Sequence, residues 1–208
     1  MIGFLTEKIL SYISRKGAIN ADDEEVRAFY KYGIEITISS ILNIVIIVIL
    51  SLMFKGFCEG MIFLLVFIPT RQFTGGFHAD TYFRCNLTFA VCFTITLFAC
   101  RYTAGMLSVW TKTAMLLGEL ILIAAICPIE NKHKPINERR QYIRSKVLSI
   151  ALFMLFGIGG MAVARYAPAY GNMALYSLHL IAVMGIIGVL KGGKKDHEKA
   201  KQNSKDPC

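Results

Sequence analysis

Six apolar stretches constrain the fold of this chain more than any other feature. They fall near residues 34–54, 57–69, 86–100, 105–127, 147–164 and 173–190. Hydrophobic residues make up 55% of the 208, and each stretch is continuously apolar, whereas the strands of a membrane barrel alternate. Because only helices and closed barrels satisfy their backbone groups in lipid, the sequence predicts an all-α polytopic membrane protein with six transmembrane helices.

Two of these stretches are short. The stretch 57–69 has 13 residues and 86–100 has 15. At 1.5 Å per residue the first reaches about 20 Å, less than the ~30 Å of hydrocarbon in a bilayer. We therefore expect two short helices whose junction, at Gly75 and Gly76, lies below the level of the lipid headgroups.

The two ends of the chain differ from the apolar part. Residues 1–17 place Ile2, Leu5, Ile9, Tyr12 and Ile13 on one helical face, but they are too few and too polar to span a membrane. They predict an amino-terminal interfacial amphipathic helix on the cytosolic leaflet. We expect residues 1–190 to form a single helical membrane domain. The basic tail, 191–208, has little apolar content and is expected to be disordered in the cytoplasm.

The net charge of +9 is unevenly distributed along the chain. With six spans, one side of the membrane receives every lysine and arginine except Lys55, Arg101, Lys112 and Arg165. Positive residues mark the cytoplasmic side. The pattern therefore predicts a multi-pass protein of the cell membrane, with both termini and the loop between the second and third spans in the cytoplasm. The basic excess suits anionic membrane lipid, and no nucleic-acid partner is expected.

That loop carries one histidine and one cysteine, His78 and Cys85. Imidazole and thiol together can attack a carbonyl covalently. In an unbroken helix seven residues would separate them by about 10.5 Å along the axis, too far for a hydrogen bond of about 3 Å. Gly75 and Gly76 would let the chain fold back, and a helix starting near Cys85 would favour its thiolate. We therefore predict that Cys85 is a nucleophile and His78 its base and later an acid.

Other ionisable side chains have two interpretations each. Arg71 would hold a substrate carboxylate or stabilise an oxyanion, or would anchor its helix at the cytosolic side. Asp80 could orient the imidazole, but a helix cap is the better interpretation. Glu119 and His179 lie inside apolar stretches, where ionisable groups often mark function, although we favour a structural role such as an interhelical hydrogen bond. The six cysteines form no CxxC pattern and there is no nucleotide motif, so we infer neither a metal nor a cofactor.

The chain resembles the accessory gene regulator B (AgrB) family, the membrane peptidases of Gram-positive quorum sensing. The likeness covers nearly the whole length and agrees with the six-span topology. It rests on Arg71-xxx-Gly75-Gly76-Phe77-His78-Ala79 followed by Cys85, on Tyr32-Gly33-Ile34-Glu35, and on Pro128-xx-Asn131-Lys132.

The resemblance implies a cysteine endopeptidase that cleaves and cyclises a precursor peptide into a thiolactone or lactone autoinducing pheromone. It makes His78 and Cys85 the catalytic pair. Arg71, Gly75, Gly76 and Lys132 are the expected substrate-binding or oxyanion residues. The implied partner is a precursor with an amphipathic leader and an acidic carboxy-terminal extension, and a homodimer is a candidate assembly.

Two alternatives compete with this interpretation. The first is a non-enzymatic membrane transporter or channel for a peptide or ion, in which Glu119 and His179 line a pathway. The second is a family member that binds peptide without chemistry, and the intact His78 and Cys85 argue against it. Cleavage that survives Cys85→Ala would exclude the enzyme.

Overall fold

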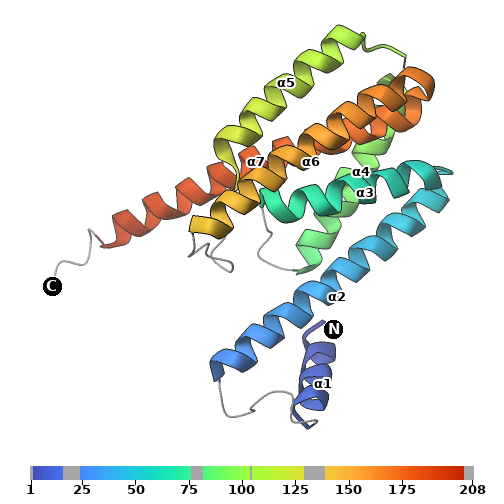
Figure 1. The fold of residues 1–208 in the computed structure, drawn as a ribbon. Helices are drawn as coiled ribbons and strands as arrows, with labels where there is room; N and C mark the ends of the chain where they lie inside the picture. Colours follow the sequence, from blue (N-terminus) through green and yellow to red (C-terminus); the bar gives the residue numbers. More distant parts are fainter. Residues whose placement is uncertain (1, 16–23, 76–81, 104, 129–138, 204–208) are drawn as a thin grey trace.

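Seven α-helices make up the described part of the chain (Figure 1). The computed structural model describes residues 2–15, 24–75, 82–103, 105–128 and 139–203. The helices are α1 (Ile2–Arg15), α2 (Glu24–Met53), α3 (Phe57–Thr74), α4 (Tyr82–Thr103), α5 (Val109–Ile126), α6 (Arg139–Tyr166) and α7 (Pro168–Asn203). The all-α architecture predicted from the apolar stretches is therefore confirmed.

Five helices, α2, α4, α5, α6 and α7, are long and apolar enough to cross a membrane. The sixth expected span, α3, does not belong to this group. It carries Glu59 in its first turn, Pro69 inside and Arg71 in its last turn. Because α3 contacts α2, α4, α6 and α7, much of its surface faces protein, and a continuous apolar surface is not needed there. The protein is thus a polytopic membrane protein with five such helices.

Helix α4 corrects the expectation of two short helices. It has 22 residues, of which 83–103 form a candidate span. At 1.5 Å per residue α4 is about 33 Å long, enough for the hydrocarbon layer. The helix is longer than its apolar stretch because it includes Phe83, Arg84 and Cys85 at one end and Arg101 near the other.

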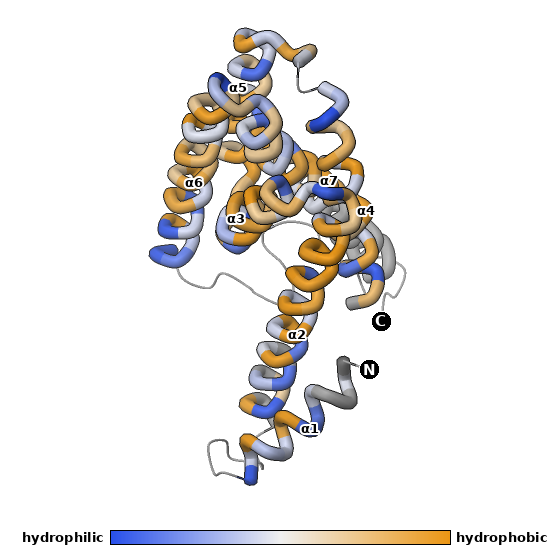
Figure 2. The backbone as a smooth tube through the Cα atoms, turned by 90° about the vertical axis from the view of Figure 1, so that its right-hand side faces the viewer, coloured by the Kyte–Doolittle hydropathy of each residue, from blue (hydrophilic) through white to orange (hydrophobic). Residues whose placement is uncertain are grey.

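The first two helices form an arm beside the bundle. Helix α2 extends past the other helices, and α1 packs along its first turns (Figures 1 and 2). Thr6 and Leu10 of α1 are buried, while Tyr12 is exposed. Polar residues of α2 gather in the part beside α1, and the part that enters the bundle is apolar (Figure 2). One side of the amphipathic helix predicted over residues 1–17 therefore packs against α2.

Aromatic side chains and close helix contacts fix α3 between its neighbours. The ring centroids of Phe63 and Phe93 lie 5.1 Å apart, and those of Phe67 and Phe89 4.9 Å. Helix α3 also approaches α2 closely at Gly60, where a Cβ atom would lie 1.8 Å from the hydroxyl oxygen of Ser51. These contacts pack α3 against α2 and α4, and the ring pair of Phe67 and Phe89 lies about one turn from Arg71 and from Cys85.

Arg101 of α4 forms hydrogen bonds with the turn between α2 and α3. Its guanidinium donates hydrogen bonds to the carbonyl oxygens of Phe54 (2.9 Å) and Lys55 (3.1 Å) and pairs with Glu59 at 3.4 Å. Backbone carbonyls at a helix end carry partial negative charge, which suits a cation. Since Arg101 is near the last residue of α4, this connection lies at the opposite end of that helix from Cys85.

Helix α7 packs closely against α6 and then continues beyond the bundle. A Cβ atom at Gly171 would lie 2.1 Å from the backbone nitrogen of Ala164, so glycine is required where the two backbones approach. The helix runs to Asn203 and includes most of the basic tail whose composition predicts disorder. Lysine, glutamate and alanine, which are common in this segment, are good helix formers.

Candidate active site

Cys85 lies in the first turn of α4 and is partly buried. The first four N–H groups of a helix have no partner within the helix, and they give its amino-terminus a partial positive charge. The side chain of Cys85 therefore lies beside this partial positive charge. The expectation that Cys85 stands near a helix amino-terminus is confirmed.

Arg71 lies in the last turn of α3, and its side chain is partly buried. Its guanidinium is close enough to interact electrostatically with Cys85, and also with Cys92 and Cys127. It donates a hydrogen bond of 3.0 Å to the carbonyl oxygen of Gly75, and its Cζ lies 5.9 Å from the centroid of the Phe67 ring. The side chain therefore brings a positive charge into the thiol site.

Gly75 ends α3 with backbone angles that favour glycine. Its φ is 71° and its ψ is −147°, a combination that is essentially restricted to glycine. Its N–H donates to the carbonyl oxygen of Arg71 at 3.1 Å, which closes the last turn of the helix. The prediction that a glycine provides the backbone freedom at this point is confirmed for Gly75. The other predicted residues Gly76, His78, Asp80 and Lys132 lie outside the described residues.

Among the three thiols near Arg71, Cys85 differs from the other two in its position. Cys127 is 1% exposed, and burial raises the pKa of its thiol to about 11, so it stays protonated at neutral pH. Cys92 lies two turns further along α4, about 10.5 Å from Cys85 along the helix axis. Only Cys85 of the three lies in the first turn of a helix.

A hydrogen bond beside Cys85 links α4 to α2. The hydroxyl of Ser39 donates to the side-chain oxygen of Asn86 at 2.9 Å. Asn86 follows Cys85 directly and points to α2, so the bond sets the rotation of α4 about its axis. Sequence reasoning missed this pair. The signal was an asparagine at the start of an apolar stretch, where a polar side chain needs a partner.

Glu119 and His179 form a second polar site, between α5 and α7. The Nδ1 atom of His179 lies 2.5 Å from Oε1 of Glu119. The side chain of His179 is 44% exposed and that of Glu119 is 12% exposed. Both line a cavity of about 30 Å³, which is room for about two waters. An interhelical hydrogen bond was the favoured interpretation of Glu119, and the structure confirms it, with His179 as the partner that the sequence did not reveal.

The fold and the thiol site define an α-helical polytopic membrane protein with a cysteine at a helix start beside an arginine. A family model described as accessory gene regulator B matches residues 6–190. The chain therefore belongs to the AgrB family, and it has a role in accessory gene regulator peptide quorum sensing.

Two curated relatives come from Clostridium perfringens. AgrB-like protein 2 of strain 13 is 24% identical over 160 residues, which cover 73% of this chain and 74% of that protein. The AgrB-like protein of strain SM101 is 22% identical over 159 residues, with the same coverage. These names state likeness to the family and no demonstrated activity. No solved structure matches the chain.

Proposed function

We propose that this protein is an integral-membrane cysteine endopeptidase that cleaves a precursor peptide and cyclises the product into a thiolactone or lactone pheromone. The observation that carries the proposal is Cys85 in the first turn of α4, within electrostatic reach of Arg71. Family membership gives the peptide-processing context. His78 acts as the general base and acid.

In the first step His78 takes the thiol proton and the sulfur of Cys85 attacks the carbonyl carbon of the scissile peptide bond. The C–N bond breaks, and the proton passes from His78 to the leaving amine. Arg71 and the N–H groups of the first turn of α4 stabilise the oxyanion. The amino-terminal part of the substrate is then held on Cys85 as a thioester, and the acidic carboxy-terminal extension leaves.

In the second step a cysteine or serine side chain of the held peptide attacks the thioester carbonyl. The C–S bond to Cys85 breaks, its sulfur regains a proton through His78, and the ring closes. Exchange of one thioester for another is close to neutral in free energy, so no nucleotide is required. Hydrolysis must be prevented by keeping water out, which a partly buried thiol favours.

The remaining residues and the topology follow from the same proposal. Gly75 and Gly76 allow the chain to place His78 over Cys85, and Lys132 binds the acidic extension of the precursor. Both termini and the site face the cytoplasm, where the precursor meets the membrane lipid through its amphipathic leader. A homodimer remains part of the proposal.

Product masses from purified protein in bilayers test this function. Wild-type protein incubated with a synthetic precursor should give the released acidic segment and a second product whose mass is lower than that of the linear acid by one water. Cys85→Ala and His78→Ala should give neither, while Cys92→Ala, a thiol on the same helix, should give both. Retained cleavage in Cys85→Ala would refute the proposal.

The transporter alternative depends on Glu119 and His179, and the cavity beside them is relevant to it. A volume of about 30 Å³ is too small for a peptide, which argues against a peptide pathway and does not bear on an ion pathway. The enzyme is the proposed function because the thiol site supports it.

A further inference from the structure

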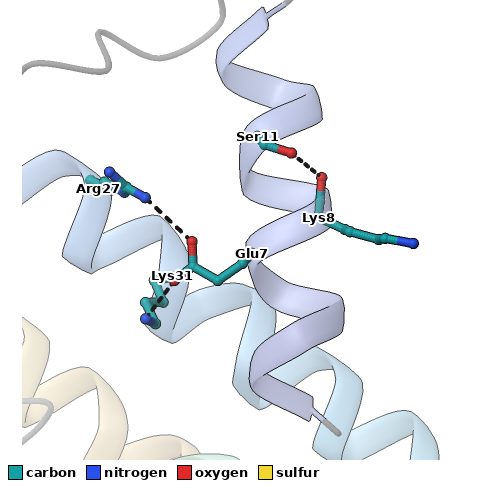
Figure 3. A network of polar contacts seen from close by, with 5 residues as sticks. All are labelled: Glu7, Lys8, Ser11, Arg27 and Lys31. Atoms are coloured by element: carbon teal, nitrogen blue, oxygen red, sulfur yellow. Dashed lines mark hydrogen bonds and ion pairs between the residues drawn. The ribbon is translucent and has the colours of Figure 1, made fainter.

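A carboxylate on α1 is held by two cations on α2. Glu7 Oε1 lies 2.7 Å from Nζ of Lys31, and its Oε2 lies 3.3 Å from Nη2 of Arg27 (Figure 3). The hydrogen bond from Lys31 holds the pKa of the Glu7 carboxyl below its usual value, so the group is ionised at neutral pH. Arg27 and Lys31 are four residues apart, one above the other on the helix. Together they bind both oxygens of one carboxylate.

This contact can exchange with a carboxylate from another chain. The side chains of Arg27, Lys31 and Glu7 are 56%, 44% and 45% exposed. Ion pairs this exposed add little to the free energy of unfolding and are weakened by salt. Thr6 and Leu10 of α1 are buried, whereas Glu7 is not, so Glu7 can leave the cations without removing these two buried side chains from their contacts.

The position of the cations relative to Cys85 can be measured along α2. The hydrogen bond from Ser39 to Asn86 marks the level of the turn that carries Cys85. Lys31 and Arg27 lie eight and twelve residues before Ser39 in an unbroken helix, about 12 Å and 18 Å along the axis. An extended peptide advances about 3.3 Å per residue. Four to six residues therefore cover the distance from the thiol level to the two cations.

We propose that Arg27 and Lys31 form a carboxylate-binding subsite for acidic residues about four to six positions beyond the cleaved bond, and that Glu7 occupies it in the free protein. The inference rests on the proposed function, since the ligand is the acidic segment of the same peptide substrate. Glu7 is an internal competitor, which the incoming peptide displaces. The subsite adds affinity and sets the position of the scissile bond, whereas the bond itself is cut at Cys85.

A purely structural role for the same contact predicts a different pattern of results. If Glu7 only fastens α1 to α2, removing any of the three charges loosens α1 in the same way. If the cations bind substrate, Glu7→Gln strengthens peptide binding, and Arg27→Gln with Lys31→Gln weakens it. The opposite signs separate the two roles.

Peptide binding in the absence of cleavage tests the subsite directly. The full chain carrying Cys85→Ala, in nanodiscs of neutral phosphatidylcholine, is titrated into fluorescein-labelled hexaglutamate while fluorescence anisotropy is recorded. Arg27→Gln with Lys31→Gln should weaken binding roughly three- to tenfold, and Glu7→Gln should strengthen it about twofold. Arg15→Gln, which removes one charge from the end of α1, is the matched control and should have a smaller effect. Labelled hexaglutamine should not bind.

Two results would overturn the inference. One is equal binding by the wild type and the Arg27→Gln, Lys31→Gln variant. The other is weaker binding by Glu7→Gln, as for the cation variants. Cleavage gives a second measurement: the cation variants should raise KM with kcat unchanged, and Glu7→Gln should lower KM. If no variant cleaves any precursor, the proposed function fails, while the anisotropy result still decides the subsite.

Discussion

Ser39 on α2 donates a 2.9 Å hydrogen bond to Asn86, the residue that follows Cys85 on α4. The bond joins two helices, α2 and α4, at the turn of α4 that carries Cys85. Asn86 points to α2, while Cys85 lies within electrostatic reach of Arg71 on α3. Helix α2 therefore contacts α4 next to the residue that interacts with Arg71.

A double-mutant cycle on Ser39 and Asn86 should show coupling. Ser39→Ala and Asn86→Ala should each lower kcat/KM, and the double variant should be little worse than either. The coupling in the free energy of unfolding should be about 1 kcal/mol, as for an ordinary hydrogen bond. Ser40→Ala is the control, because that exposed hydroxyl bonds only to the carbonyl of its own helix at Ile36. Strictly additive effects would show that the bond does not position α4.

Gly75→Ala should abolish cleavage. At a φ of 71° and a ψ of −147° a Cβ atom is strained, at a cost of about 1–3 kcal/mol, and the end of α3 would shift. The measurement is product formation from a synthetic precursor, with circular dichroism to show that the helices persist. Gly118→Ala is the control, because a Cβ atom there meets nothing within 4 Å. Full activity of Gly75→Ala would mean that its backbone angles do not matter for the site.

Thiol labelling should distinguish Cys85 from Cys127. With a pKa of about 11, only about 0.1% of Cys127 is thiolate at pH 8, so it should resist iodoacetamide until the pH passes about 10. Cys85 should label first, and Arg71→Gln should slow its labelling because the thiolate loses a nearby cation. Arg71→Lys should keep much of the rate. Mass spectrometry of digested protein gives both rates, and equal rates at pH 8 would contradict the assignment.

The Glu119–His179 pair should respond asymmetrically to mutation. His179→Leu leaves the carboxylate of Glu119, only 12% exposed, without its imidazole, whereas Glu119→Leu leaves a histidine that can be neutral. We therefore expect His179→Leu to lower the free energy of unfolding by more, about 1–3 kcal/mol. Adding Glu119→Leu should restore part of the loss. Unfolding in mixed micelles measures it, and equal losses would exclude the unpaired-carboxylate explanation.

The sequence predicted local features of this protein well. Apolar stretches identified five helices that can cross a membrane, and the glycine before the histidine motif was correctly placed at a helix end. Cys85 was correctly expected at a helix start. These features depend on residues close together in the chain, where spacing and glycine content carry the information.

Contacts between distant helices could not be predicted in the same way. The partners Ser39 and Asn86, or Glu119 and His179, are 47 and 60 residues apart, and many polar side chains could have paired instead. Helix α3 was expected as one of the six spans, although its apolar stretch was the shortest of them. Its contacts with α2, α4, α6 and α7 explain its charged ends. Those contacts depend on the positions of all four neighbours, which the sequence of α3 does not contain.

The proposed chemistry rests on one covalent bond between the sulfur of Cys85 and a peptide carbonyl carbon. Its most direct test is the intact mass of protein in bilayers, quenched with acid after mixing with a precursor whose ring-closing residue is alanine. The wild type should gain the mass of the amino-terminal peptide acid less one water, digestion should place it on Cys85, and neutral hydroxylamine should remove it. A precursor that is cleaved without this adduct, or with the adduct on another thiol, would contradict the account.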